Sequence, residues 1–395
     1  MQAAVTQLPG QRLFALDAAR GIAMLLVCVS HFLDIYVLGD IASESAFVGA
    51  IHLVCRTATP TFVLVSGILL GYQIEARGSQ FAAFRTHLLD RALFVVTVGH
   101  ILISLSLAAR RSSFASAMAQ GHITDTIALC VMIGISLVPT IGTRLRLVVG
   151  LCLTIGSWFA WQFWNPEDPL LQFIKSVALG PLSNGRAVFL FPLFPWLGVY
   201  IAGSAVGGWL SSASSQGMWL VSRRLLRISF AMVTTALAIK ASFILRTYIG
   251  GGALETGWYQ YLSPHQKYPP GLFFILLFGG TALLLLSVLF SGAQLSWMRA
   301  CLSFAETIGR NTFPIFAVQF FLYYTLLYLF VTRVAVITPV VAMVLLPLSL
   351  IGVWAFARVC QHYKVSRFLT VGGRLLMSEP TKRSETVHQK HRSAA

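Results

Sequence analysis

Charged side chains are scarce in this sequence, and acidic ones are scarcer still. Only 11% of its 395 residues are Asp, Glu, Lys or Arg and only 13 residues are acidic, whereas 56% are hydrophobic. Ordinary soluble domains carry about a quarter charged residues, so this composition excludes a soluble globular protein. With a mean hydropathy of +0.76, the chain is predicted to be an all-α polytopic membrane protein.

No two cysteines show the C-x-x-C spacing of a redox or zinc motif. The six lie mostly inside apolar runs, at Cys28, Cys55, Cys130, Cys152, Cys301 and Cys360. Neither a disulfide framework nor a zinc site is indicated by this pattern. We therefore expect the cysteines to be small core residues, and we predict no metal site.

The sequence also shows no signal-peptide cleavage pattern and no room for a soluble domain. About twelve mostly polar residues precede an apolar run that is too long for a signal peptide, so the run is expected to be a retained first span. The predicted organisation is a polar segment over residues 1–12, a transmembrane domain over 13–362 and a basic, disordered cytoplasmic tail over 363–395.

Apolar segments of about 20 residues predict ten transmembrane helices. Their expected bounds are Leu13–Leu38, Val48–Ile74, Leu89–Ala108, Ile123–Ile141, Leu147–Trp164, Val188–Leu210, Ile228–Ile249, Pro270–Ser291, Thr312–Val331 and Ala335–His362.

The formal charge of +16 is explained by topology rather than by nucleic-acid binding. Basic residues gather in alternate loops, which the positive-inside rule assigns to the cytoplasm, and the pair Arg110–Arg111 is the clear exception. Ten spans then place both termini in the cytoplasm, with the tail resting against anionic headgroups. The expected location is the cytoplasmic, or inner, membrane.

Two long loops are predicted on the outer side, Asn165–Ala187 and Gly251–Pro269. Both contain aromatic and proline-flanked stretches, which suit a partly ordered cover over a substrate mouth. Plain connectors with aromatic residues at the membrane interface would have the same composition.

The first span carries ionisable residues on one helical face. Arg20 and His31 are eleven residues apart, which is about 20° past three full turns and about 16 Å along the axis. Asp17 lies three residues before Arg20, and Asp34 lies three residues after His31, so each carboxylate is at pairing distance. Ionisable residues inside a span are costly and are functional by default.

A carboxylate beside one ring nitrogen raises the basicity of a histidine and fixes its tautomer, as a general base requires. His31 and Asp34 could alternatively satisfy one another at the outer interface without any catalytic role.

The arginine, ten intervening residues and histidine, preceded by LDAARG, resemble the signature of the transmembrane acyltransferase superfamily. That superfamily includes the acyltransferase 3 family, the membrane glucan succinyltransferases and the heparan-α-glucosaminide N-acetyltransferase catalytic domain. The stretch TPTFVLVSGILLGY is similar to the serine-glycine stretch of the second span, although Ile68 stands where an aromatic residue is common. Four further stretches are similar to the heparan-acetyltransferase-like branch, in the order ITDTIAL, FPLFPWLGVYIAGSAVGGWL, KYPPGLFFILLFGG and IGRNTFPIFAVQ.

The resemblance implies transfer of an acyl group, acetyl or succinyl above all, from cytoplasmic acyl-CoA to a hydroxyl or amine of an extracytoplasmic glycan or sugar. No permanently bound cofactor is expected, because acyl-CoA is a co-substrate. Arg20 would contact the donor's phosphate or pantetheine end, His31 would take the acceptor's proton, and Asp34 would orient His31. Direct attack and an acyl-histidine intermediate both remain open.

Other polar residues complete the predicted site. Arg56 needs a carboxylate partner, for which Asp34 or Asp125 would serve, either within the site or as a structural ion pair. Arg91 would help to hold donor phosphates or is an ordinary positive-inside residue. Asp125 is either a helix cap or an acceptor contact, and His100 reads as a hydrogen-bonded core residue. Candidate donors to the reaction's oxyanion are Ser66, Asn311 and Gln319.

A secondary transporter or flippase of a polar or anionic envelope metabolite is the rival class, because ten spans with buried charge suit it too. Against it stand the absence of repeated halves and the concentration of catalytic-type residues on one helix.

Overall fold

The structure, a computed structural model, describes residues 13–36, 46–110, 113–180, 189–213, 217–249, 261–263, 266–333, 339–369 and 371. Within these ranges the chain is helical and contains no strand, which confirms the all-α prediction. The predicted N-terminal segment and most of the predicted tail lie outside the described residues.

Thirteen of the described helices account for the predicted spans. They are α1 (Phe14–Tyr36), α3 (Ala58–Arg77), α4 (Phe81–Phe94), α5 (His100–Leu107), α7 (Ile123–Leu137), α8 (Thr143–Phe163), α10 (Leu193–Ser212), α11 (Gly217–Tyr248), α13 (Leu272–Phe274), α14 (Gly280–Gly292), α16 (Thr312–Phe320), α17 (Tyr328–Arg333) and α18 (Pro339–His362). Three π-helical segments make continuous passes by joining α4 to α5, α13 to α14 and α16 to α17, at Val95–Gly99, Ile275–Gly279 and Phe321–Leu327.

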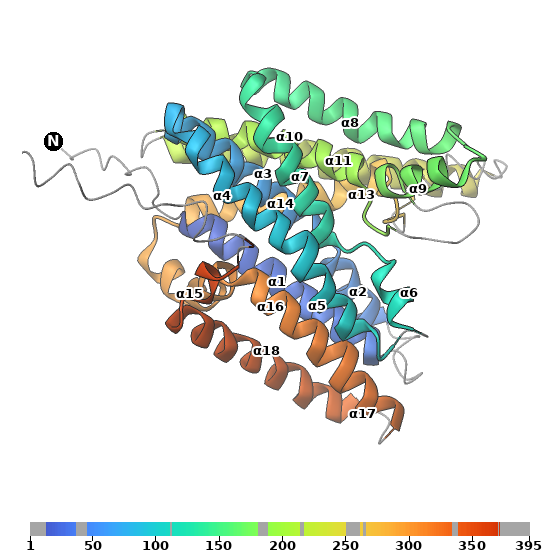
Figure 1. Ribbon diagram of the computed structural model, residues 1–395. Helices are drawn as coiled ribbons and strands as arrows, with labels where there is room; N and C mark the ends of the chain where they lie inside the picture. Colours follow the sequence, from blue (N-terminus) through green and yellow to red (C-terminus); the bar gives the residue numbers. More distant parts are fainter. Residues whose placement is uncertain are drawn as a thin grey trace, which may run out of the picture.

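Nine described helical stretches are long and apolar enough to cross a membrane. One of them, Ala46–Leu107, has 62 residues and would be about 93 Å long if straight, about three times the hydrocarbon thickness. It turns back at Gly78–Gln80, where Gly78 has a φ of 51°, so it makes two passes (Figure 1). The predicted second and third spans correspond to these two passes.

Three helices lie where loops were predicted. The short α6 (Phe114–Met118) precedes the fourth predicted span, and α9 (Pro169–Ala178) lies in the first long outer loop. The third, α15 (Ser296–Arg310), has a strongly one-sided apolar face and lies between the eighth and ninth predicted spans. Each is too short or too polar to have been detected as an apolar run of about 20 residues.

The second predicted span is broken. Helix α2 (Ala46–Cys55) ends before a turn at Arg56 and Thr57, and α3 then begins at Ala58. Pro60 stands in the first turn of α3 and has no backbone N–H to continue an uninterrupted α2–α3 helix. The proline therefore accounts for the break.

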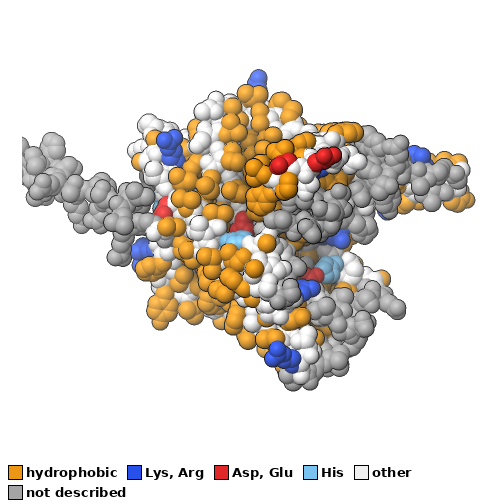
Figure 2. Space-filling view, turned by 45° about the vertical axis from the view of Figure 1, so that its right-hand side comes forward, with side chains coloured by type: hydrophobic (Ala, Val, Ile, Leu, Met, Phe, Trp, Pro, Cys, Tyr) orange, Lys and Arg blue, Asp and Glu red, His pale blue; other side chains and the backbone are white. Residues whose placement is uncertain are grey.

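Helix α1 lies among α2, α3, α14, α15, α16 and α18, as Figure 1 shows. Helices α11 and α18 are mostly exposed, whereas α10 is the most buried of the candidate spans. Hydrophobic side chains dominate the face shown in Figure 2, and its charged side chains are few. We call the end of the bundle at Tyr36 and α2 the outer end, following the predicted topology, and the opposite end the inner end.

Helices α3 and α10 are held together through glycines spaced four residues apart. A Cβ on Gly67 would overlap the carbonyl oxygen of Tyr200, and one on Gly71 would overlap that of Ser204. From the facing helix, Gly207 meets the Ile68 carbonyl oxygen in the same way. Small residues at this spacing let two membrane helices approach backbone to backbone.

The cysteine prediction was partly wrong. Cys28, Cys55, Cys130 and Cys360 are buried, but Cys152 and Cys301 are exposed. Cys152 lies on α8, a helix with much of its apolar surface outside the protein core, so an apolar run did not imply a core position there.

Gly71→Ala is expected to destabilise the protein, because the added methyl group would have to displace the α10 backbone. Overpacking of this kind costs about 1–3 kcal/mol, and it should lower the apparent melting temperature measured in nanodiscs. The matched control is Gly156→Ala in α8, where a Cβ would meet nothing within 4 Å and helix propensity gains about 0.5–1 kcal/mol. An equal response of the two variants would contradict this packing account.

Candidate functional site

Arg20 and His31 both lie on α1, as predicted, and both are half-buried. The helix is continuous between them, so the axial separation of about 16 Å holds. The sequence thus places one basic group toward the inner end and one toward the outer end of a single central helix.

His31 is held by Gln319 of α16. Its Nδ1 lies 2.7 Å from Gln319 Oε1. Because an amide oxygen only accepts hydrogen bonds, Nδ1 carries the hydrogen and Nε2 is left with its lone pair in the neutral ring. Gln319 is fully buried, and its Nε2 has no hydrogen-bond partner among the described residues.

Aromatic rings surround His31. Phe320 and Tyr324 pack edge-on against it, with ring centroids 4.9 and 5.0 Å from its own. Gln319 and Tyr324 are five residues apart and would point about 140° away from each other on a regular α-helix. The π-helical segment Phe321–Leu327 changes this register, so both side chains reach His31. Such segments frequently occur at functional sites.

Asp34 was predicted to orient His31, and the structure gives its carboxylate two other contacts. The Tyr324 hydroxyl donates to Asp34 Oδ2 at 3.0 Å, and His52 Nε2 lies 3.5 Å from Asp34 Oδ1. The His52 and Asp34 side chains are 32% and 37% exposed, so this pair forms an edge of the site that is open to the surroundings. Asp34 therefore accepts a hydrogen bond from Tyr324, whose ring packs on His31, and pairs with His52 of α2.

Positive charge lies on the outer side of His31. The charges of Lys267 and Arg110 act on its ring. Arg110 lies over the Tyr324 ring at 5.3 Å, and the Lys267 ammonium lies 5.1 Å from the Tyr268 ring centroid. The predicted topological exception at Arg110 is thus explained by its place beside the site.

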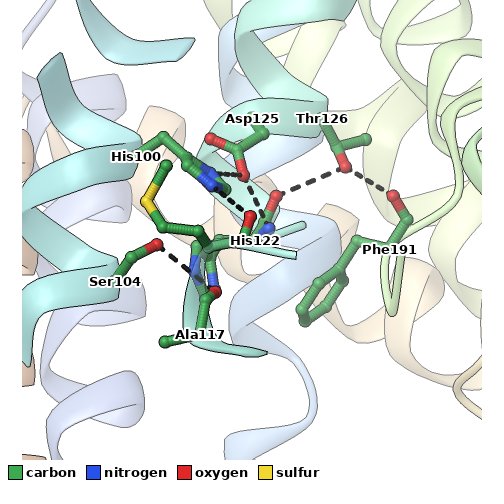
Figure 3. Close-up of polar contacts among 8 residues, drawn as sticks. His100, Ser104, Ala117, His122, Asp125, Thr126 and Phe191 are labelled. Atoms are coloured by element: carbon green, nitrogen blue, oxygen red, sulfur yellow. Dashed lines mark hydrogen bonds and ion pairs between the residues drawn. The ribbon is translucent and has the colours of Figure 1, made fainter. Parts of the chain in front are cut away.

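A second polar cluster joins α5, α6 and α7 (Figure 3). His100 Nδ1 lies 2.8 Å from Asp125 Oδ2, and His100 Nε2 lies 3.0 Å from the Met118 carbonyl oxygen. Both ring nitrogens face acceptors, so the geometry favours the imidazolium form paired with the carboxylate. Asp125 also accepts from the His122 backbone N–H at 2.7 Å and completes a capping box.

This second cluster borders the first. The His122 ring lies 5.4 Å from that of His100 and 5.9 Å from that of Phe320, which in turn packs on His31. Asp125 is confirmed as a helix cap, and His100 is hydrogen-bonded as expected, although it is half-buried and not a core residue. The apolar ring of Phe320 packs between the two clusters, against His31 on one side and His122 on the other.

At the inner end, Asp17 contacts α15 across the close α1–α15 packing. Arg310 Nε lies 3.7 Å from Asp17 Oδ2, and Arg310 also pairs with Glu306, four residues before it on α15. On α4, Asp90 accepts the Val371 backbone N–H at 3.1 Å, and the neighbouring Arg91 is exposed. The basic residue predicted to hold donor phosphates is therefore at the surface.

The remaining predicted residues are spread over the bundle. Ser66 hydrogen-bonds to Tyr200, and Asn311 donates to the Thr307 and Ala357 carbonyl oxygens, which ties α15 to α18. Arg56 lies at the α2–α3 break and interacts with Tyr268. The carboxylates suggested as its partners, Asp34 and Asp125, have the other contacts described above.

Sequence reasoning missed Tyr324, His52 and Lys267 as members of the site. A histidine near the start of an apolar span was a usable signal for His52, and Lys267 stands in one of the stretches that carried the family resemblance. Tyr324 gave no signal, because its direction depends on the π-helical register. Within the described ranges, no three His, Cys, Asp or Glu side chains form a group that could hold a metal ion.

The arrangement around His31 is chemically specific. A half-buried imidazole with one nitrogen fixed by an amide oxygen offers the other nitrogen as a proton acceptor. Cations on one side and aromatic faces around it provide surfaces that a polar, ring-shaped substrate could contact.

Asp125→Ala should destabilise the protein by about 3 kcal/mol, because it removes the buried carboxylate that pairs with His100 and leaves the histidine uncompensated. Asp168→Ala is the matched control. Asp168 also caps a helix start, accepting from Leu170 N and Leu171 N, but it is exposed, so the expected cost is about 1 kcal/mol. Thermal unfolding in nanodiscs would compare the two variants. Equal decreases in melting temperature would contradict a stabilising contribution from the His100–Asp125 pair.

The sequence model of the family described as "Heparan-alpha-glucosaminide N-acetyltransferase, catalytic" matches residues 12–247, more than half of the chain. No curated protein and no solved structure gave a match. The matched range contains Arg20, His31 and Asp125, whereas Lys267, Gln319 and Tyr324 lie beyond it. The chain therefore belongs to the heparan-α-glucosaminide N-acetyltransferase catalytic family, which makes it an acetyltransferase-type membrane protein.

Proposed function

We propose that this protein transfers an acyl group, acetyl or succinyl, from cytoplasmic acyl-CoA to a hydroxyl or amine of an extracytoplasmic sugar or glycan, with His31 as the general base. Family membership supports the acetyltransferase class. The donor, the acceptor and the role of His31 are our proposals.

The observation that carries the proposal is the 2.7 Å contact between His31 Nδ1 and Gln319 Oε1. It leaves His31 Nε2 as the basic nitrogen of a ring that packs edge-on against Phe320 and Tyr324. A general base needs this combination of fixed tautomer and fixed direction.

The proposed reaction has two steps, attack of the acceptor on the thioester and collapse of the tetrahedral intermediate. The acceptor oxygen or nitrogen attacks the thioester carbon while its proton moves to His31 Nε2. The carbon–sulfur bond breaks when the tetrahedral intermediate collapses, and the CoA thiolate takes the proton from His31 to leave as the thiol. One carbon–oxygen or carbon–nitrogen bond is formed and one carbon–sulfur bond is broken. His31 has taken and returned one proton, so it ends in its starting state.

Gln319 is our choice among the three candidate oxyanion donors. Its Oε1 is engaged by His31, whereas its buried Nε2 has no hydrogen-bond partner among the described residues. A buried donor that is left unsatisfied costs about 1–3 kcal/mol, and an oxyanion arising beside the base would satisfy it. Ser66 and Asn311 have contacts elsewhere, so they fit this role less well.

His31→Ala is expected to abolish acyl transfer, and Gln319→Leu to reduce kcat by about 100-fold or more, since one oxyanion donor contributes about 100- to 1,000-fold. The KM for acyl-CoA should stay within about twofold, because neither residue is proposed to bind the donor's nucleotide end. Radiolabelled acetyl transfer to a panel of aminosugars would measure both.

The matched control is Gln361→Leu, since Gln361 is an exposed glutamine on α18; it should retain wild-type turnover. Wild-type turnover in the His31→Ala protein would remove His31 from the mechanism.

Arg20→Ala should weaken acetyl-CoA binding by about 10-fold or more, because a charge-assisted bond to a phosphate is worth about 1.5–3 kcal/mol. Calorimetric titration of acetyl-CoA and free CoA into protein in nanodiscs measures this. No binding of acetyl-, succinyl- or longer acyl-CoA to a folded sample would contradict the proposed function and direct attention to transport.

A further inference from the structure

An apolar groove runs along the outside of α1 and α2. It has a volume of about 310 Å³ and is lined only by apolar side chains and one cysteine, namely Leu26, Val29, Phe47, Ala50, Ile51, Val54 and Cys55. Its rim is open to the membrane, because Phe47 and Val54 are 73% and 59% exposed. Hydrocarbon is the occupant that such a surface favours in a bilayer.

Helix α2 places this groove against the polar site. It has ten residues, only Cys55 of which is buried, and the break at Arg56 and Thr57 separates it from α3. Ile51 lines the groove, whereas the next residue, His52, pairs with Asp34. Asp34 in turn accepts from Tyr324, whose ring packs on His31. A continuous series of contacts therefore leads from the groove to His31.

Charged groups of both signs lie where the groove and the site meet, the Asp34 carboxylate with the cations of Lys267 and Arg110. The thiol of Cys55, in the groove wall, is within electrostatic range of both Asp34 and Lys267. Lys267 and Arg110 also act on His31, and Arg56 directly follows Cys55 in the chain. An anionic group placed beside the imidazole would therefore be within electrostatic range of two cations, Lys267 and Arg110.

We infer that the acceptor is a sugar carried on a lipid phosphate. Its hydrocarbon chain occupies the α1–α2 groove, its phosphate lies by Lys267 and Arg110, and its sugar reaches His31. The inference rests on the proposed function, which left the acceptor as a sugar or glycan of any kind. The three parts of the ligand match three adjacent surfaces, which are apolar, cationic and basic in that order.

A lipid-linked sugar fits the groove and the site together better than an annular lipid or a soluble glycan does. A bulk lipid would satisfy the groove but would leave the cations beside His31 unexplained, and a soluble glycan would leave the groove unexplained. Lateral entry past α2 also lets the acceptor approach His31 without leaving the membrane, whereas the donor approaches from the cytoplasm.

Three acceptor probes separate the contributions of chain and phosphate: farnesyl phosphoryl glucosamine, glucosamine 1-phosphate and octyl glucosaminide. Transfer from labelled acetyl-CoA in nanodiscs should show a kcat/KM for the farnesyl diester that exceeds either fragment's by about 30-fold or more, since a buried hydrocarbon chain contributes per CH₂ group. Equal values for the diester and glucosamine 1-phosphate would overturn the inference.

Val54→Trp tests the groove directly, because the larger ring fills it. The preference for the diester over glucosamine 1-phosphate should fall about 10-fold. Leu151→Trp in α8 is the matched control, since Leu151 is also 59% exposed to the membrane and lies outside the groove; it should keep the full preference. An equal loss in both variants would overturn the assignment of the groove.

Photolabelling provides a readout that needs no turnover. A benzophenone-bearing farnesyl phosphate should label the peptide containing Phe47–Cys55 above all other membrane-exposed peptides, and farnesyl phosphoryl glucosamine should compete. Labelling spread evenly over α8, α11 and α18 would overturn the inference. Labelling at α2 without transfer to any probe would instead contradict the acyltransferase proposal, so the two failures are distinguishable.

Discussion

A polar side chain inside a hydrocarbon layer must find its partner within the protein, and the polar residues of α1 impose this requirement on every helix around it. Gln319 of α16 meets His31, Tyr324 and His52 meet Asp34, and Arg310 of α15 meets Asp17. Helix α1 is central for this reason as well as for its apolar packing. The site is assembled by the same contacts that satisfy the buried polar groups.

The lengths of the apolar segments were sufficient to predict the membrane-spanning helices. Helix geometry was sufficient to place Arg20 and His31 on one face of α1, because both features depend on local sequence patterns. They were not sufficient for the partners. Gln319 could be named as a candidate donor by its chemistry, but its contact with His31 depends on how α16 packs on α1. Tyr324 depends further on a π-helical segment, for which the sequence carries no periodic signal.

Arg110 is the residue that departs from the positive-inside pattern of the predicted topology. Basic residues are sparse on the outer side of a membrane protein because they oppose the preferred orientation. Arg110 is retained there over the Tyr324 ring, in electrostatic contact with His31. A local violation of a general pattern is expected where a site requires it, and Lys267 supplies a second cation at the same place.

The packing of α1 on α15 also limits the route of a donor. A Cβ on Gly21 would overlap the Ala305 carbonyl oxygen, and one on Gly309 would overlap that of Asp17. The two backbones touch at these points, immediately beside Arg20, so no chain as thick as a pantetheine arm can pass between them. A donor that approached Arg20 from the inner end, as we propose, would therefore have to lie along the other sides of α1, because the α1–α15 contact is closed to it.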